Sequence, residues 1–493
     1  MYLLGFDIGS SSIKVALVDA RTGKTAGIAH APDREMDIAA PQPGWAEQDP
    51  DIWWDNCRTA LQKLLRQTKI PPEEISAVGI SYQMHGLVSI DREGRVVRPA
   101  IIWCDSRAVG IGEAAFRDLG EDYCLQHYLN GPGNFTASKL KWVRDNEPAQ
   151  YERIRHILLP GDYIAFRMTG EALTTVSGLS EGILWDFAEN DVSLRLLDHY
   201  GLDRSLIPPV APAFGKQGYL SEPAAAYLGL KPGIPVTYRA GDQPNNALAL
   251  NVLNPGEVAA TGGTSGVVYG VVDNPASDPQ NRVNSFAHVN HRHEAPRIGV
   301  LLCINGAGIL YGWMRKQVAL DGVSYEEMEQ MAASVPVGAD GLRIIPFGNG
   351  AERMLGNRPA AASIVNLHFN RHGRAHLYRA ALEGIAFSFV YGVKILQELG
   401  LNVSVMRVGN DNLFQSAVFS QTIAQLLGCR IEMLRTTGAV GAAIASGVGI
   451  GLWNDAGEGL GALEPLHIYE PQGPVNVFQE AFDDWNTHLK KLI

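Results

Sequence analysis

The feature that most constrains the fold occurs twice: an apolar strand, a turn rich in glycine and hydroxyl side chains, and a second apolar strand. The first copy has strands at 2–6 and 13–19 around Asp7-Ile8-Gly9-Ser10-Ser11-Ser12, and the second spans 257–271 around Gly262-Gly263-Thr264-Ser265-Gly266. Glycine lets the backbone approach a ligand closely, and free amides with hydroxyls suit phosphate oxygens. Because one copy opens each half, the pattern predicts two related α/β lobes that each hold part of a nucleotide. For either turn alone, a tight hairpin without a ligand is the ordinary alternative.

A carboxylate stands just before the second turn. A strand predicted at 230–238 leads to Gly241-Asp242, and a small-residue helix is predicted at 245–252. Phosphoryl transfer needs a group that positions and deprotonates a nucleophile, and it needs donors for the phosphate oxygens. Asp242 and the turn at 262–266 supply both within one short stretch, so we predict that this stretch joins the two lobes.

Length and composition narrow the class of protein. A chain of 493 residues is too long for one ordinary core, so two large domains are expected. The net charge of −11 argues against a general affinity for nucleic acid or for anionic membranes. The five cysteines are scattered without a C-x-x-C pair, which fits a reducing cytoplasm. Neither a signal peptide nor an uninterrupted apolar span of membrane length is apparent, and a homodimer is expected only as the commonest oligomer.

Two familiar nucleotide motifs do not fit the N-terminal segment. No G-x-G-x-x-G follows the first strand, which disfavours a dinucleotide-binding fold. Gly23-Lys24-Thr25 resembles the end of a P-loop, but position 18 is Val where that motif requires its first glycine. We interpret this GKT as a turn.

Two strand ends in the first half carry polar and aromatic side chains. After an amphipathic helix predicted at 51–66, a strand at 75–81 ends in Tyr82-Gln83-Met84-His85-Gly86, and a second ends in Trp103-Cys104-Asp105-Ser106-Arg107. Polar groups that converge at strand ends of an α/β fold favour a pocket, and a Met-His pair suits a polyol. A lone histidine is more often structural, and the serines of 173–182 more often cap turns than line a pocket.

In the second half, Asn305-Gly306-Ala307-Gly308 is predicted to begin a helix, and a long helix is predicted at 374–399. A strand at 405–408 ends at Gly409-Asn410-Asp411-Asn412, and 436–443 opens a helix of small residues. Either of these last two segments can present backbone to a purine, because glycine permits close approach. For 438–443, tight helix packing is an equal alternative. The tail at 474–493 is predicted to be one amphipathic helix.

Together these motifs resemble the FGGY carbohydrate kinases, and among them most closely the xylulokinases. The segments that carry the resemblance cover nearly the whole chain, and include FDIGSSSIKVALVD, GISYQMHGLV, AGDQPNNALALN, GGTSGVV and TTGAVGAAIASGVG. The resemblance implies an actin-like (ribonuclease-H-like) two-lobed α/β ATPase fold, with ATP and a sugar in the interlobe cleft. It divides the chain into a sugar-binding lobe at 1–247, a nucleotide-binding lobe at 248–455, and an extension at 456–493 that packs on the second lobe.

The resemblance also implies roles for individual residues. Asp242 corresponds to the general base, and Asp7 to the carboxylate near the Mg²⁺–phosphate assembly, so these two are the expected Mg²⁺ ligands, either directly or through water. The sugar would contact Met84, His85, Trp103, Asp105, Asp242 and Gln243. The nucleotide would contact Asp7, Gly9, Ser10, Ser11, Gly263, Thr264, Ser265, Gly306, Gly409, Asn410 and Asn412. Two segments depart from the family pattern, the adenine-side loop at 408–412 and the less acidic loop at 174–181.

The function expected from this resemblance is transfer of the γ-phosphoryl group of ATP to the terminal hydroxyl of D-xylulose, which gives D-xylulose 5-phosphate. The glycerol kinases carry Arg-Glu where this chain has Met84-His85, and this difference favours a ketopentose over glycerol. A kinase for another ketose or a polyol stays open, because motifs do not reveal side-chain placement. A non-catalytic actin-like protein that binds ATP or a sugar is the alternative from a different class, and it would need neither Asp242 nor the QMHG strand end.

Overall fold

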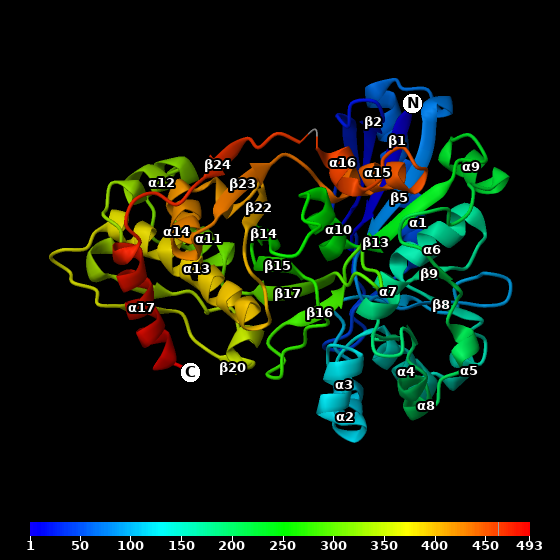
Figure 1. Ribbon diagram of the computed structural model, residues 1–493, viewed down its shortest axis with the longest axis horizontal. Coiled ribbons are helices and arrows are strands. Elements are labelled where there is room, and N and C mark those ends of the chain that lie inside the picture. The colour runs from blue at the N-terminus through cyan, green and yellow to red at the C-terminus, as the bar shows by residue number, and fades with distance from the viewer. Residues whose placement is uncertain (462) are drawn as a thin grey trace.

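The computed structural model describes residues 1–461 and 463–493, so one position of the predicted extension at 456–493 lies outside the described residues. Two lobes lie side by side, each built around a β-sheet covered by helices (Figure 1). The two predicted α/β lobes are therefore confirmed.

The sheet of the first lobe has the order β13-β5-β1-β2-β3. Its strands are β1 (Tyr2–Ile8), β2 (Ile13–Asp19), β3 (Thr25–Ala31), β5 (Ile75–Tyr82) and β13 (Val236–Gly241). Strands β1, β2 and β3 form an antiparallel meander, whereas β5 and β13 add on in parallel. The C-terminal ends of β1, β5 and β13 consequently lie at one edge of the sheet.

The sheet of the second lobe repeats this topology. Its order is β16-β17-β15-β14-β22-β23-β24, with β14 (Glu257–Gly262), β15 (Gly266–Val272), β16 (Asn284–Ala287), β17 (Ile298–Ile304), β22 (Val405–Gly409), β23 (Arg430–Leu434) and β24 (His467–Tyr469). An antiparallel meander of β14, β15 and β17 is extended in parallel by β22 and β23. The short repeat seen in the sequence is therefore the start of two sheets with equivalent strand order.

The remaining elements connect and cover these sheets. The helices are α1 (Pro50–Thr68), α2 (Val109–Leu119), α3 (Glu121–His127), α4 (Thr136–Asn146), α5 (Pro148–Tyr151), α6 (Pro160–Thr169), α7 (Val176–Glu181), α8 (Leu194–Tyr200), α9 (Glu222–Leu228), α10 (Asp242–Ala249), α11 (Gly308–Gln317), α12 (Tyr325–Ala333), α13 (Arg374–Glu398), α14 (Ala417–Leu427), α15 (Gly438–Gly449), α16 (Ala456–Leu460) and α17 (Asn476–Lys490). Short strands are β4 (Glu47–Gln48), β6 (Val88–Ile90), β7 (Ala100–Ile101), β8 (His156–Leu158), β9 (Thr174–Thr175), β10 (Trp185–Asp186), β11 (Asp191–Val192), β12 (Val210–Ala211), β18 (Arg343–Ile345), β19 (Ala351–Glu352), β20 (Arg358–Pro359) and β21 (Ser363–Val365).

Helix α1 shows how local sequence sets an element. The Asp49 side chain caps it by accepting a hydrogen bond from the Asp51 amide at 3.0 Å, and Pro50 occupies its first position. The face with Trp53, Trp54, Cys57, Leu61 and Leu64 is buried, as predicted. A capped helix with one apolar face packs on the meander and forms one side of the first core.

Helix α15 crosses from the second lobe to the first. It follows β23 but packs on the first sheet, where β-carbons at Gly5 and Gly79 would overlap the carbonyls of Ala439 and Ala442. Figure 1 shows α15 and α16 in orange beside the blue strands of the first lobe. The small residues of α15 are thus used for close packing, which was one of the two alternatives for this segment.

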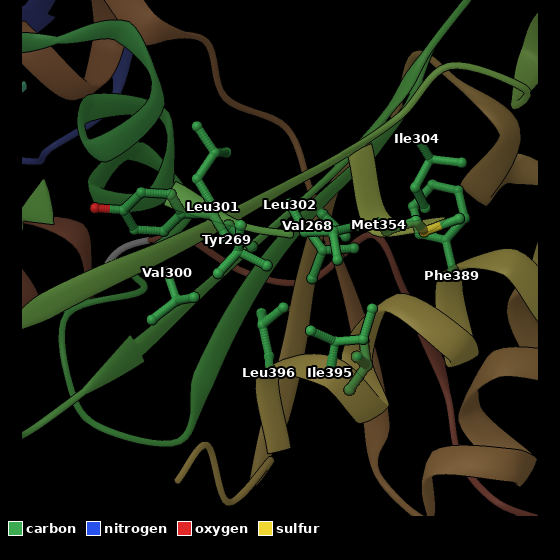
Figure 2. Close-up of a cluster of buried hydrophobic side chains, with 14 of the residues drawn as sticks. Val268, Tyr269, Val300, Leu301, Leu302, Ile304, Met354, Phe389, Ile395 and Leu396 are labelled. Carbon is green, nitrogen blue, oxygen red and sulfur yellow. The ribbon is translucent and has the colours of Figure 1, made fainter. Parts of the chain in front are cut away.

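Helix α13 forms the core of the second lobe. By length and composition it is the one helix in residues 1–461 and 463–493 that is apolar enough to cross a membrane, yet 83% of its most apolar window is buried. Figure 2 shows Phe389, Ile395 and Leu396 of this helix packed on side chains of β15 and β17. The predicted terminal helix is α17, whose Trp485 indole donates to the Ile344 carbonyl at 2.9 Å. Both helices therefore belong to the second core.

Candidate active site between the lobes

Two carboxylates stand at the C-terminal edge of the first sheet. Asp7 pairs in register with Ser81, whose hydroxyl donates to Asp7 Oδ1 at 3.0 Å, and Ser81 pairs in turn with Ala240. Asp242 directly follows β13 at the same edge of the sheet and lies close enough to Asp7 for the charge of that carboxylate to act on it. It is the first residue of α10, which begins three residues before the predicted start because Pro244 fits the first turn. The strand register thus brings Asp7 and Asp242 together.

The environment of these carboxylates favours proton uptake. Loss of contact with water, followed by the negative charge of Asp7, raises the pKa of Asp242 to about 7. Desolvation also raises the pKa of Asp7, although Lys14 and the Ser81 hydroxyl oppose this shift. A carboxylate that exchanges its proton near neutral pH is suited to act as a general base.

The second lobe reaches this edge through the start of α15. The Asn245 side-chain amide of α10 donates to the carbonyl of Gly438 at 2.9 Å, and Gly438 also lies against Asp7. Because α15 begins at the C-terminal end of β23, the C-terminal edges of the two sheets meet at Asp7. The site at this edge is therefore built by both lobes.

A cavity of about 280 Å³ opens beside these strand ends. The first lobe contributes His85, Trp103 and Asn134, and the second lobe contributes Asn284 and Arg353. Met84 lies next to this cavity without lining it, because its side chain is buried against Gly241. The structure thus brings His85 and Trp103 together on one cavity.

His85 is held in one orientation and one protonation state. Its backbone is left-handed, with φ of 60°, and its Nδ1 lies 2.8 Å from the carbonyl oxygen of Glu181. A carbonyl only accepts, so Nδ1 carries the proton and Nε2 is left as an acceptor. Burial first, and then the charge of Lys139, lowers the pKa of His85 to about 3. The imidazole is therefore neutral, and its free nitrogen accepts hydrogen bonds.

Trp103 and Asp105 lie on the same loop but face different surroundings. The Trp103 indole is 54% exposed and donates to the Ser10 hydroxyl at 3.2 Å, so it links the cavity to the first turn. Asp105 is 0% exposed, and its oxygens accept from the Arg107 guanidinium and from the Ala46 amide at 2.6 Å. Because its oxygens are bonded within the protein, Asp105 holds the loop in place and does not line the cavity.

The two glycine-rich turns lie at equivalent edges of the two sheets. In the first, the Gly9 amide donates to the Ser12 carbonyl at 3.1 Å, and Ser11 is exposed. In the second, Thr264 and Ser265 are exposed, whereas the Gly263 carbonyl accepts from the amide at the start of α11 at 3.0 Å. Exposed hydroxyls on tight turns at the end of each first strand suit phosphate oxygens.

The other residues predicted to contact the nucleotide differ in exposure and in whether their polar groups are already hydrogen-bonded within the protein. The Gly306 amide donates to Glu352 at 3.1 Å and is buried, so this donor is occupied within the protein. The Asn412 side chain accepts from the Phe414 amide at 3.0 Å, and Gly409 and Asn410 are partly exposed beside it. A β-carbon on Gly262 would lie 3.7 Å from Asn412 Oδ1, so the loop at 409–412 borders the second turn.

Sequence reasoning missed three charged side chains around this site. Arg353 lines the cavity from the second lobe and donates to Asn281 and Val283 backbone carbonyls. Glu181 is 1% exposed, and neither carboxyl oxygen has a hydrogen-bond partner within the described residues. Lys139 is buried behind His85. Each stands in a segment whose local pattern gives no sign of burial.

Comparison with known proteins identifies the family. A family model described as "FGGY family of carbohydrate kinases, N-terminal domain" matches residues 2–249, and the corresponding C-terminal model matches residues 258–450. The xylulose kinase of Escherichia coli K12 is 30% identical over 448 residues, which cover 90% of this chain and 88% of that protein. A protein named "Probable L-xylulose kinase" from Haemophilus influenzae is 28% identical over 449 residues, with 90% and 89% coverage.

The fold comparison agrees with the sequence comparison. The crystal structure of xylulose kinase from Rhodospirillum rubrum superposes with a TM-score of 0.89 at 27% identity, covering 100% of this chain and 99% of that chain. Agreement over the whole length includes both sheets and the actin-like arrangement of the lobes. With family models matched in each lobe and two carboxylates where the lobes meet, the protein belongs to the FGGY family of carbohydrate kinases and is an enzyme of that class.

Proposed function

We propose that the protein transfers the γ-phosphoryl group of ATP to the terminal hydroxyl of D-xylulose. The observation that carries this proposal is the cavity lined by the neutral His85 acceptor and by Trp103. His85 follows β5, which lies between β1 with Asp7 and β13, which leads into Asp242. An open-chain ketopentose presents several hydroxyl donors to such an acceptor. The likeness to xylulose kinases over nearly the full chain supports the same sugar class.

In the proposed mechanism Asp242 accepts the proton of the attacking hydroxyl. Its raised pKa matches this task, since a base near neutrality is partly ionised and still takes up a proton readily. The loose transition state of phosphoryl transfer places most of the catalytic demand on positioning and on charge stabilisation. Amides and hydroxyls of the turns at 9–12 and 262–266 would supply donors to the phosphates, and closure of the lobes would exclude water.

We infer that Mg²⁺ accompanies the nucleotide. Residues 1–461 and 463–493 contain no group of three or more His, Cys, Asp or Glu side chains arranged to hold a metal ion. Magnesium in such enzymes is bound through one or two carboxylates plus phosphates and waters. Asp7 and Asp242, desolvated and mutually repelling, fit that donor set. When bound, the cation would neutralise charge on the transferring group.

The individual site assignments follow from this proposal. His85, Trp103 and Gln243 would contact the sugar, and Met84 would support His85 from behind the cavity wall. Gly9, Ser10, Ser11, Thr264 and Ser265 would face the phosphates, while Gly409, Asn410 and Asn412 would border the nucleoside. Asp105 and Gly306 would act by shaping their loops, since their polar groups are already bonded within the protein. Five free thiols support a reducing cytoplasm as the place of action.

A panel of sugars tests the proposal. ADP release would be measured with ATP and Mg²⁺ in the presence of D-xylulose, L-xylulose, D-ribulose, ketohexoses, glycerol and xylitol. The proposal expects the highest kcat/KM for D-xylulose, with 5-phosphorylation seen in the product by ³¹P NMR. A higher kcat/KM for L-xylulose would instead assign that enantiomer as the substrate. The Haemophilus influenzae relative named "Probable L-xylulose kinase" favours this alternative. Preference for a polyol would overturn the ketopentose assignment.

A further inference from the structure

Lys139 is a charged residue in an apolar position. It lies in the first half of α4, and its side chain is 0% exposed. Its ammonium donates to the carbonyl oxygen of His85 at 2.8 Å and to the carbonyl oxygen of Ile102 at 3.0 Å. Both acceptors are neutral main-chain groups. The buried charge is therefore used to hold backbone.

The two carbonyls belong to chain segments that separate from each other. Leu87 and Ile101 exchange backbone hydrogen bonds of 2.9 and 3.1 Å. This residue pair joins the two segments just before they reach His85 and Trp103. Beyond this pair, His85 turns away with its left-handed backbone. Its carbonyl needs a donor from elsewhere, because a buried unpaired carbonyl costs about 1–3 kcal/mol. Lys139 supplies that donor to both segments.

Burial makes this ammonium costly to maintain. Desolvation lowers the pKa of Lys139 to about 7, while Asp105, Cys104 and Glu181 favour its charged form and Arg107 opposes it. A methionine of similar volume would avoid that cost, since apolar groups pack without desolvation of a charge. The presence of a charged lysine here therefore indicates that the two loops need the hydrogen bonds that its ammonium donates.

We propose that Lys139 is a positioning residue of the sugar site: its ammonium fixes the peptide groups next to His85 and Trp103, the two of the predicted sugar contacts that line the cavity. This inference rests on the proposed function. Lys139 itself does not line the cavity. It acts through the spacing of the two side chains, and so its contribution falls mainly on sugar binding. The hydrogen bond from Trp103 to Ser10 passes a smaller effect to the phosphate turn.

The test compares Lys139→Met with Lys141→Met. Lys141 stands on the same helix but forms a solvent-facing ion pair with Asp145 at 2.6 Å, so its removal controls for loss of a lysine from α4. Lys139→Met is expected to raise the sugar KM about tenfold or more, with the ATP KM and kcat within about threefold of wild type. Lys141→Met is expected to match wild type. An unchanged sugar KM in folded Lys139→Met would overturn the proposal.

A second measurement applies if Lys139→Met does not fold by circular dichroism. The sugar Kd of the double variant Asp242→Asn, Glu181→Gln would be followed by calorimetry from pH 6 to 9, because these two changes remove two buried carboxyls near the cavity whose pKa values are raised. Affinity is expected to fall severalfold above pH 7 as the ammonium is lost, and a constant Kd would overturn the proposal. Failure of the proposed function would appear differently, as a wild-type enzyme without sugar-dependent ADP release.

Discussion

Gly438, the first residue of α15, lies so close to Asp7 that a β-carbon on it would be 2.8 Å from Asp7 Oδ2. The same β-carbon would be 2.9 Å from Asn246 Oδ1 on α10. Only glycine leaves room for the carboxylate at this point. The positive end of α15 is consequently directed at the carboxylate edge of the other lobe.

Gly438→Ala should therefore reduce activity without unfolding the protein. The displaced Asp7 carboxylate should lower kcat by about tenfold to 100-fold, because small misplacements of positioning groups are costly. Alanine in a helix otherwise favours stability by about 0.5–1 kcal/mol over glycine, so Tm should change little. Gly110→Ala in α2 is the control, since that site has open space around it. Full activity of Gly438→Ala would show that the contact has no role in catalysis.

Asp242→Asn should separate sugar binding from turnover. The amide keeps the shape of the side chain but takes up no proton, so kcat should fall by about 10² to 10⁴-fold. The sugar Kd, measured by calorimetry, should stay within severalfold of wild type. Turnover close to the wild-type rate would reject Asp242 as the base.

The rate should depend on pH through Asp242. Its raised pKa of about 7 means that acid converts the ionised base to its inactive protonated form. Thus kcat/KM for the sugar should be constant above neutrality and fall about tenfold per pH unit below it. The measurement is a series of initial rates at limiting sugar from pH 5 to 9, with the free enzyme's stability checked at each pH. A kcat/KM that stays constant down to pH 5 would indicate an unshifted carboxylate.

Removal of the His85 acceptor should weaken sugar binding more than chemistry. His85→Ala should raise the sugar KM about tenfold while kcat changes severalfold or less, as expected for an interaction present in ground and transition states. His85→Asn serves as the comparison, because asparagine tolerates the left-handed backbone better than alanine. A sugar KM unaffected by either change would assign His85 a purely structural role.

Glu181 should limit stability at neutral and alkaline pH. Burial, and then the charge of Asp242, raises its pKa well above the ordinary value, so the folded protein retains a proton that the unfolded chain releases. Wild-type stability should therefore decline as pH rises above about 4.5, the pKa of glutamate in an unfolded chain.

Glu181→Gln lacks this titration and should unfold at a higher Tm than wild type at pH 8, by an amount that shrinks at pH 5. The gain arises because folded wild-type protein must keep a proton on Glu181 that the unfolded chain releases at pH 8, whereas glutamine has no such requirement. Glu189→Gln, an exposed change nearby, should have no effect. A Tm difference that is equal at both pH values would contradict a titrating Glu181.

Much of this architecture is encoded locally. The apolar runs of β1, β2 and β5 and the single apolar face of α1 are each set by a few consecutive residues, and all four elements match their predicted positions within about two residues. The repeated strand–turn–strand pattern also predicted two lobes. This pattern did not predict the full strand order, because that order is set by contacts between segments far apart in the sequence.

The charged residues around the cavity show why the rest was not predictable. Lys139 stands in a segment that contains several basic residues, and local periodicity assigns such a side chain to solvent. Its burial arises from two strand ends that approach α4 only in the folded chain. Asp105 is the reverse case, since a carboxylate at a strand end suggested a ligand contact but is taken by Arg107. In both cases tertiary packing decided the role.

The crossing of α15 also has a consequence for how the chain is made. One face of the first sheet, with Leu3, Ala77 and Tyr238, is covered by a helix that begins only at Gly438. During synthesis that face has no cover until most of the protein has left the ribosome. The first lobe is therefore translated before the second, but its core is completed only after α15 has been made.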